Sequence, residues 1–259
     1  METIAVIAQR GGVGKTTTAH ALGVGLRLYH GAEVLFIDLD AQGNLSRTLE
    51  ADPAAADIVS VLTGRIPAAE AVQHTEHGDL IASSKALTGA EGEESLRTVG
   101  REYRLKKALE PLSGMYTHVI IDTPPALSIL TINALTAADK VIIPAQAEDY
   151  SLSALERIRE TLDAVRTYTN PSLQVDGILL TRYTGRAIIS REMAEMIGEA
   201  AEQMGTRLYN TRIRECTAIK EAQAMREDIY TYSPRSNAAK DYRAFLNEIS
   251  NTEGNEHDG

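Results

Sequence analysis

Cysteine is almost absent from this chain: Cys216 is the single cysteine among 259 residues, and tryptophan is missing altogether. One thiol cannot form an internal disulfide, and it is too little to hold an iron–sulfur cluster of the reductase type. Aromatic residues make up 5% of the sequence, which favours an aliphatic core over an aromatic binding platform. This cysteine usage predicts a reducing, cytoplasmic setting.

Long apolar runs are also missing. No stretch reaches the roughly 18 apolar residues of a membrane span, and no charged-then-apolar leader opens the chain. The net charge of −10 argues against a general basic coat for nucleic acid, although a local basic patch stays possible. The length predicts a single domain over residues 1–250. We expect the acidic residues 251–259 to form a disordered tail.

A glycine-rich stretch at residues 9–17 gives the strongest signal in the sequence. It reads Gln-Arg-Gly-Gly-Val-Gly-Lys-Thr-Thr, follows an apolar run and precedes a helical pattern. Strand, glycine turn and helix N-terminus form the context in which backbone N–H groups bind phosphates. Lys15 would reach the β- and γ-phosphates, and the Thr16 hydroxyl would ligate Mg²⁺. The predicted phosphate-binding residues are Gly11, Gly12, Val13, Gly14, Lys15, Thr16 and Thr17.

Aspartates follow two other apolar runs. Asp38 ends the apolar run at residues 33–38, and Asp40 follows two residues later. Asp122 ends the apolar run at residues 116–122, directly before Thr-Pro-Pro. In an open α/β sheet the carboxyl ends of the strands face the ligand crevice, so Asp122 would hold a water on Mg²⁺ there. Taken alone, residues 38–44 are explained equally well as a turn rich in Asp, Gly and Asn.

Together these stretches resemble the ParA/MinD-type ATPases. That family carries a deviant Walker A loop, Lys-Gly-Gly-x-Gly-Lys-Thr, and Arg10 stands in the place of its first lysine. Partition ATPases of the ParA/Soj kind read Asp-x-Asp-Pro-Gln-Gly-Asn where this chain has residues 38–44, with Ala41 in place of proline. The resemblance covers residues 3–249. It implies a P-loop NTPase of the α/β class, with a mostly parallel twisted sheet flanked by helices on both faces.

The resemblance also implies an activity, which is hydrolysis of ATP with Mg²⁺, and a role for each matched residue. The catalytic residues would be Lys15, Asp40 and Arg10, with Asp40 positioning or activating the attacking water. Thr16 and Asp122 would hold the metal, and Asp38 would act in its outer shell. ATP would join two subunits into a homodimer, so that Arg10 reaches the partner's phosphates. A ParB-like partner protein would stimulate hydrolysis.

Two basic stretches, residues 182–186 and 211–217, bear on DNA. Soj-like proteins bind DNA without sequence preference through arginines in these regions, by neutralising phosphates. Arg186 matches a family arginine, whereas Arg212, Arg214 and Lys220 are looser substitutes. Ordinary solvated cations explain these residues about as well.

The implied function is DNA partition by a cytoplasmic, nucleoid-associated ATPase. One alternative is an ATPase that positions a cargo other than DNA, and another is a cofactor-biosynthesis ligase on the same fold. A third is a MinD-like protein on a membrane surface, which the acidic tail disfavours because anionic lipid would repel it. We therefore expect no membrane partner.

Periodicity predicts the remaining elements. Residues 79–82 would form an edge strand, residues 140–144 a fourth parallel strand, and residues 90–94 a solvated loop. Gln146 and Glu148 either line the dimer face or make a polar strand-to-helix turn. Further helices are predicted at residues 57–62, 67–73, 97–112, 128–137, 151–169 and 187–204, and a further strand at residues 174–181.

Overall fold

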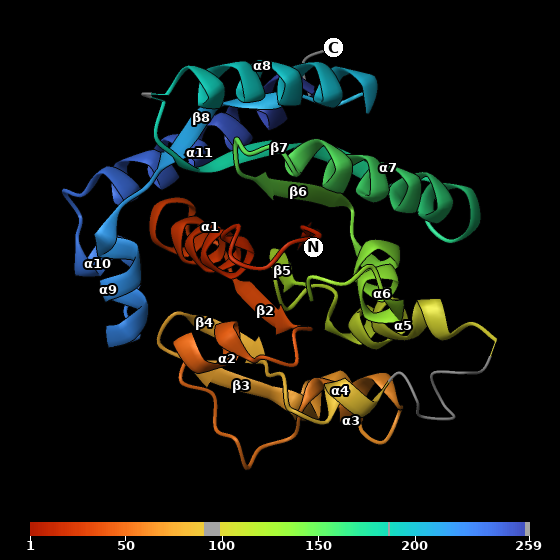
Figure 1. Ribbon diagram of the computed structural model, residues 1–259. Helices are drawn as coiled ribbons and strands as arrows, with labels where there is room; N and C mark the ends of the chain where they lie inside the picture. Colours follow the sequence, from red (N-terminus) through yellow and green to blue (C-terminus); the bar gives the residue numbers. More distant parts are fainter. Residues whose placement is uncertain (91–98, 186, 257–259) are drawn as a thin grey trace.

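The computed structural model describes residues 1–90, 99–185 and 187–256. In this part of the chain, eight strands form one sheet in the order β3-β4-β2-β5-β1-β6-β7-β8 (Figure 1). Every neighbouring pair is parallel except β3 and β4. The strands are β1 (Glu2–Val6), β2 (Val34–Asp38), β3 (Val72–Thr75), β4 (Gly78–Ile81), β5 (His118–Asp122), β6 (Lys140–Ala145), β7 (Gln174–Tyr183) and β8 (Leu208–Arg214).

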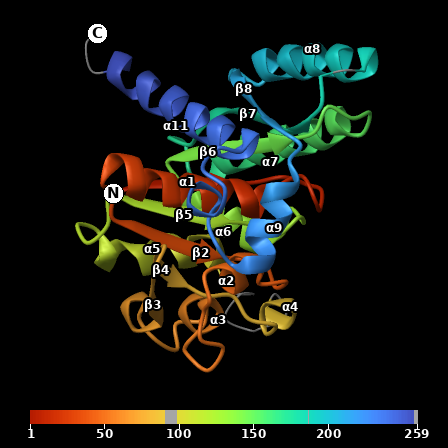
Figure 2. The same cartoon turned by 90° about the vertical axis from the view of Figure 1, so that its left-hand side faces the viewer.

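Helices cover both faces of the sheet, as the sequence predicts (Figures 1 and 2). They are α1 (Lys15–His30), α2 (Asn44–Thr48), α3 (Ile58–Leu62), α4 (Leu87–Ala90), α5 (Arg104–Leu109), α6 (Ile129–Ala137), α7 (Ser151–Tyr168), α8 (Ile188–Gln203), α9 (Thr217–Met225), α10 (Ile229–Tyr232) and α11 (Asn237–Glu256). Short 3₁₀ turns span Ala68–Ala71, Arg101–Tyr103 and Glu110–Leu112.

The sheet separates two apolar cores because successive strand residues point to opposite faces. On β5, Val119 and Ile121 pack into one core with α3, α5, α6, α7 and α8. Ile120, between them, packs into the other core with α1, α9, α10 and α11. Both sets of side chains are fully buried. This two-sided burial explains why the central strands read as nearly continuous apolar runs.

Several expected elements differ from the structure. Residues 67–73 are not a helix: a 3₁₀ turn ends at Ala71, and β3 follows, paired antiparallel with β4. The tight connection at Gly78, whose φ is 137°, makes this hairpin possible. As a result β4 is not the edge strand, since β3 lies outside it. Strand β8 was not predicted at all.

Two further expectations fall at the margins of the described residues. In place of one helix over residues 97–112, the chain from Arg101 forms two 3₁₀ turns around the short α5, and Pro111 sits in the second turn. Residues 97–98 and most of the expected loop at residues 90–94 lie outside the described residues. Helix α11 extends to Glu256 and so includes the first part of the tail expected at residues 251–259.

Helix α1 packs closely on the sheet through a glycine. A Cβ added at Gly23 would lie 2.3 Å from the Phe36 ring, closer than atoms can approach without displacement. We therefore expect Gly23→Ala to lower the free energy of unfolding by about 1–3 kcal/mol through overpacking, despite the better helix propensity of alanine. Denaturant unfolding measures this change.

Gly198 in α8 is the matched control. The nearest atom to an added Cβ there is Leu208 Cδ2 at 3.8 Å, an ordinary contact. Gly198→Ala should raise the free energy of unfolding by up to about 1 kcal/mol, because only the propensity term changes. Equal effects of the two substitutions would contradict the packing of α1 on β2.

Candidate functional site

The glycine-rich stretch forms a loop between β1 and α1. Gly12 and Gly14 have φ angles of 79° and 87°, in the left-handed region that side chains with a Cβ disfavour. Gly14 is the N-cap of α1, and no side chain caps the first turn. The loop therefore presents free backbone N–H groups at the N-terminus of the helix, which is the arrangement that binds phosphate.

Neighbouring strands hold the loop in place. Thr181 at the end of β7 donates its hydroxyl to the Val13 carbonyl at 2.7 Å. Gln146, just after β6, donates its amide to the Gly12 carbonyl at 3.2 Å and is buried. The sequence left two interpretations of Gln146, a residue of the dimer face or part of a polar strand-to-helix turn. This contact within the subunit is of the kind expected for the polar turn. Both contacts engage carbonyl oxygens, so they leave the N–H groups of the loop available to a ligand.

Lys15 is buried at the start of α1, 7% exposed. Its amino group lies 3.5 Å from the Arg10 carbonyl. Burial lowers the pKa of Lys15, while the nearby charges of Asp122 and Asp40 act in the opposite direction. The ammonium group is thus placed between the loop and two carboxylates, where it can also meet an anionic ligand.

Asp38 and Asp122 meet at the carboxyl ends of β2 and β5, where they are register partners. Both are fully buried. Burial raises the pKa of each carboxyl, and the charge of Asp38 raises the pKa of Asp122 further. Thr16 donates its hydroxyl to Asp122 Oδ2 at 2.6 Å, whereas Asp122 Oδ1 has no hydrogen-bond partner among the described residues.

The oxygen atoms of this cluster fit a hard divalent cation. Carboxylate and hydroxyl oxygens are the ligands that Mg²⁺ takes, usually with several waters retained. The unpartnered Asp122 Oδ1 supplies a buried acceptor beside the Thr16 hydroxyl. Asp38 already accepts hydrogen bonds from the Ser46 backbone N–H, the Ser46 hydroxyl and the Asp40 N–H. These contacts orient Asp38 but leave it less available than Asp122.

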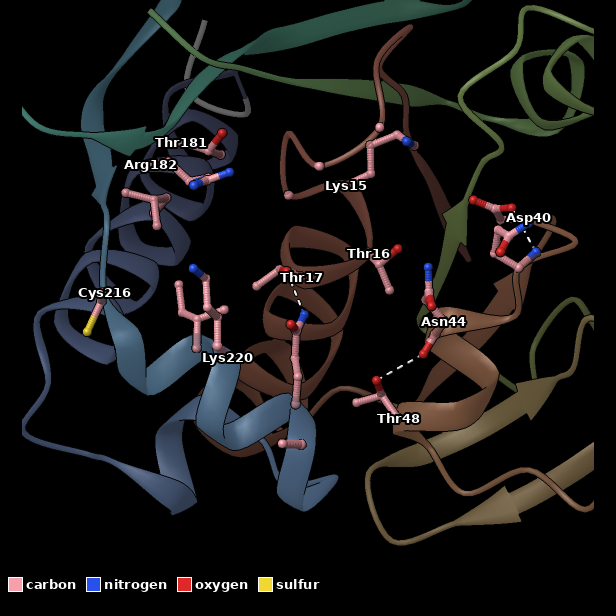
Figure 3. Close-up of a pocket in the computed structure, with 18 of the residues that line it drawn as sticks. Lys15, Thr16, Thr17, Asp40, Asn44, Thr48, Thr181, Arg182, Cys216 and Lys220 are labelled. Atoms are coloured by element: carbon pink, nitrogen blue, oxygen red, sulfur yellow. Dashed lines mark hydrogen bonds between the residues drawn. The ribbon is translucent and has the colours of Figure 1, made fainter.

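A cleft of about 730 Å³ opens beside the loop (Figure 3). One end carries Lys15, Thr16 and Asp40, and α9 forms the opposite wall. Asp40 is half-buried there, and its carboxylate accepts a hydrogen bond from the Gln42 N–H at 2.9 Å. The other lining residues include Gly11, Gly12, Gly14, Thr17, Pro125, Thr181, Arg182, Ile213, Cys216, Ile219 and Lys220.

Arg10 is not among the residues that line this cleft, and its side chain contacts other residues. Its guanidinium donates to Glu148 Oε2 at 2.6 Å and lies 5.9 Å from the centre of the Tyr150 ring. Both partners of the ion pair are about half exposed. Arg10 is thus accessible at the rim of the loop and is held by an exposed contact, which is weak in water.

Comparison with known proteins identifies the family. A family model described as an AAA domain matches residues 1–175. The sporulation initiation inhibitor protein Soj of Bacillus subtilis is 37% identical over 95% of this chain and 97% of its own. This chain belongs to the ParA/Soj-type P-loop ATPases. The structure bears out the fold class expected for them, a mostly parallel sheet between two layers of helices.

Two solved structures extend this likeness. Cobyrinic acid a,c-diamide synthase from Mycobacterium smegmatis, with a bound ATP analogue and magnesium, matches with a TM-score of 0.80 and 33% identity. The match covers 95% of this chain and 93% of that chain. The complex of Cyanothece McdA(D38A) with ATP matches with a TM-score of 0.84 and 27% identity, over 96% of each chain. Proteins with different names thus share the fold of the ParA/Soj-type ATPases.

The cations expected to bind DNA lie in different surroundings in this ParA/Soj-type chain. Arg212 stacks over the Tyr183 ring at 4.6 Å, and Arg214 pairs with Asp241 on α11. Lys220 is exposed and lines the cleft. Arg186 lies outside the described residues. Arg212 and Arg214 are both exposed on β8, and the assignment of these residues to DNA stays a prediction.

The sequence reasoning missed residues that act through tertiary contacts. Ser46 binds the buried Asp38, and Gln223 on α9 donates its amide to the Thr17 hydroxyl at 2.9 Å. No local pattern marks either residue, because the spacing to its partner is set by the fold.

None of the helices in residues 1–90, 99–185 and 187–256 combines the length and apolarity needed to cross a bilayer.

The Lys15 ammonium group is buried beside the loop, where it contacts the Arg10 carbonyl. Lys15→Ala should weaken the binding of a fluorescent ADP analogue by about 100-fold, since a buried charge-assisted contact is lost. Lys107→Ala, which removes an exposed lysine from α5, should leave the affinity unchanged. Equal affinity of Lys15→Ala and the native protein, with both folded by circular dichroism, would contradict the placement of phosphate at this loop.

Proposed function

We propose that this chain is a partition-type ATPase: ATP joins two copies, the dimer binds DNA without sequence preference, and a ParB-like partner protein stimulates hydrolysis. One observation carries the proposal, namely the buried contact of Thr16 with Asp122, whose second oxygen lacks a partner beside the phosphate-binding loop. The similarity to the chromosome partitioning protein ParA of Caulobacter vibrioides, 35% identical over 98% of this chain, supports the biological role. A cytoplasmic, nucleoid-associated location accords with this role.

The nucleotide would occupy the cleft with its phosphates at residues 11–17. Thr16 and Asp122 would hold Mg²⁺, with Asp38 orienting its outer shell. The bound ion supplies positive charge that neutralises the β- and γ-phosphate oxygens. Lys15 stabilises the same phosphates from inside the loop. The M. smegmatis structure with an ATP analogue and magnesium supports this assignment.

Asp40 is the proposed residue for the attacking water. It lies at the phosphate end of the cleft, and its backbone is fixed by Asp38 and by the Ser83 hydroxyl, which donates to the Asp40 carbonyl. A carboxylate held there can accept a proton from water and orient it toward the terminal phosphate. Hydrolysis then needs no covalent intermediate with the protein.

Arg10 is the proposed donor of charge to the second subunit. Its half-exposed side chain lies outside the cleft of its own chain, and the contact with Glu148 is an exposed ion pair that a stronger anion can replace. Arginine can bind two phosphate oxygens at once through its planar guanidinium. In a dimer closed over the nucleotide, Arg10 would therefore stabilise the charge of the transition state in the partner's site.

The role of Asp40 predicts a separation of binding from turnover. Asp40→Ala should bind ATP and dimerise, yet hydrolyse it at least about 100-fold more slowly, because the water loses its proton acceptor. Light scattering measures the dimer, and phosphate release measures turnover. Asp52→Ala, a change in the exposed loop after α2, is the charge control. Native turnover in Asp40→Ala would remove this residue from catalysis.

Nonspecific DNA binding predicts a dependence on both nucleotide and salt. Retention of the native protein on DNA should appear with ATP, disappear with ADP, and fall as salt rises, because counterions are released from the phosphates. Arg212→Ala should lower the slope of log affinity against log salt by about one if Arg212 contacts a phosphate. Arg157→Ala, an exposed arginine on α7, should leave the slope unchanged.

The same experiment separates the alternatives. Retention that ignores the nucleotide, or is absent at low salt, would contradict the DNA-partition proposal. That result would favour the alternative of an ATPase that positions a cargo other than DNA. The likeness to cobyrinic acid a,c-diamide synthase gives a further candidate, an ATP-dependent ligase, which would require an organic acid for turnover.

A further inference from the structure

Helix α9 forms one wall of the cleft through a single stripe of residues. Ile219 and Gln223 are four residues apart on the helix, so they share one face, and Arg226 follows as the C-cap. Lys220 belongs to the same face, and Cys216 precedes it at the N-cap. Figure 3 shows the Lys220 side chain extending from α9 into the space beside the phosphate-binding loop.

Lys220 differs from the other cations that line the cleft. Lys15 donates to the Arg10 carbonyl and Arg47 to the Gln42 carbonyl. Arg182 pairs with Glu215, and Arg226 pairs with Glu50. Across residues 1–90, 99–185 and 187–256, no hydrogen bond or ion pair to the Lys220 amino group is found. Its charge adds to the larger effect of Arg182 that lowers the pKa of Glu215, and its amino group remains available to a ligand in the cleft.

A contact one turn away fixes the position of Lys220. The Gln223 amide donates to the Thr17 hydroxyl at 2.9 Å, which holds α9 against the first turn of α1. Residues three apart on a helix are neighbours on its surface. Lys220 is therefore held beside Thr17, within reach of a phosphate bound at the N-terminus of α1.

The two sides of the loop would face different phosphates of a bound nucleotide. Thr16 contacts Asp122 on the side of the proposed metal, where the β- and γ-phosphates would lie. Thr17 contacts α9 on the other side. In Figure 3, Thr17 lies between Lys220 on one side and Thr16 and Asp40 on the other. A cation on the α9 side faces the part of the nucleotide that is farther from the metal.

We propose that Lys220 binds the α-phosphate of the nucleotide in its own subunit, and so serves this cleft instead of DNA. The inference rests on the proposed nucleotide-binding function and adds a binding residue to it. An ammonium group on a flexible stem can place its donors on a single phosphate without a fixed fork geometry. Nucleotides that carry only an α-phosphate would gain from the contact as much as longer ones.

Titrations of ADP and AMP into the full chain with Mg²⁺ test the proposal. Lys220→Gln should raise the Kd of both nucleotides by about fivefold, the effect of one exposed charge-assisted hydrogen bond. The factor should be the same for ADP and AMP and should shrink at high salt. Lys220→Arg should retain most of the affinity. Lys107→Gln makes the same change of charge on α5 and should have no effect.

Three results would overturn the inference. The first is an unchanged Kd in Lys220→Gln, and the second is a weaker Kd for ADP with an unchanged Kd for AMP. The third is loss of DNA retention at saturating ATP with native nucleotide affinity, which would assign Lys220 to DNA. Failure of the native protein itself to bind ADP would instead refute the proposed function, so the two failures are distinguishable.

Discussion

Two buried carboxylates at the ends of adjacent parallel strands impose the constraint on which this site depends. Asp38 and Asp122 are brought together by the register of β2 and β5, and neither is exposed to water. Burying two like charges side by side is costly unless hydrogen bonds and cations compensate. Ser46, Thr16 and Lys15 supply part of that compensation. The unpartnered oxygen of Asp122 marks what is still missing, and a divalent cation is the group that fits.

The surrounding contacts keep the loop ready for this ligand. Thr181 and Gln146 bind carbonyl oxygens of the loop, and Gln223 binds its first helical turn. The three residues come from β7, from the segment after β6 and from α9. The loop is therefore supported on several sides before any ligand arrives, which reduces the entropy lost on binding. The ends of β1 and α1 alone would not provide this support.

The central site could be predicted from the sequence because its geometry is local or follows from parallel pairing. A glycine-rich turn between a strand and a helix positions Lys15 and Thr16 by itself. Asp38 and Asp122 each end an apolar run, and parallel strands align their carboxyl ends. The same logic predicted both helical layers. The roles assigned to these residues remain proposals that the experiments above address.

Other features escaped prediction for physical reasons. Strands β3 and β8 lie at the two edges of the sheet, where half-exposed segments lose the apolar signal of central strands. Lys220 was grouped with surface arginines because sequence proximity to Arg212 and Arg214 says nothing of which way α9 packs. The contact of Gln223 with Thr17 and the burial of Ala218 and Ala222 against the core place that helix on the cleft.

The most direct test of the account is the thermal unfolding of the native protein with Mg²⁺ alone, ADP alone with a chelator, and both together. A ligand that binds only the folded state stabilises it in proportion to the logarithm of its concentration over Kd. If Asp122 and Thr16 complete a joint site, Mg²⁺ with ADP should raise Tm by more than the sum of the separate shifts. Equal shifts with ADP in the presence and absence of Mg²⁺, or no shift at all, would contradict the account.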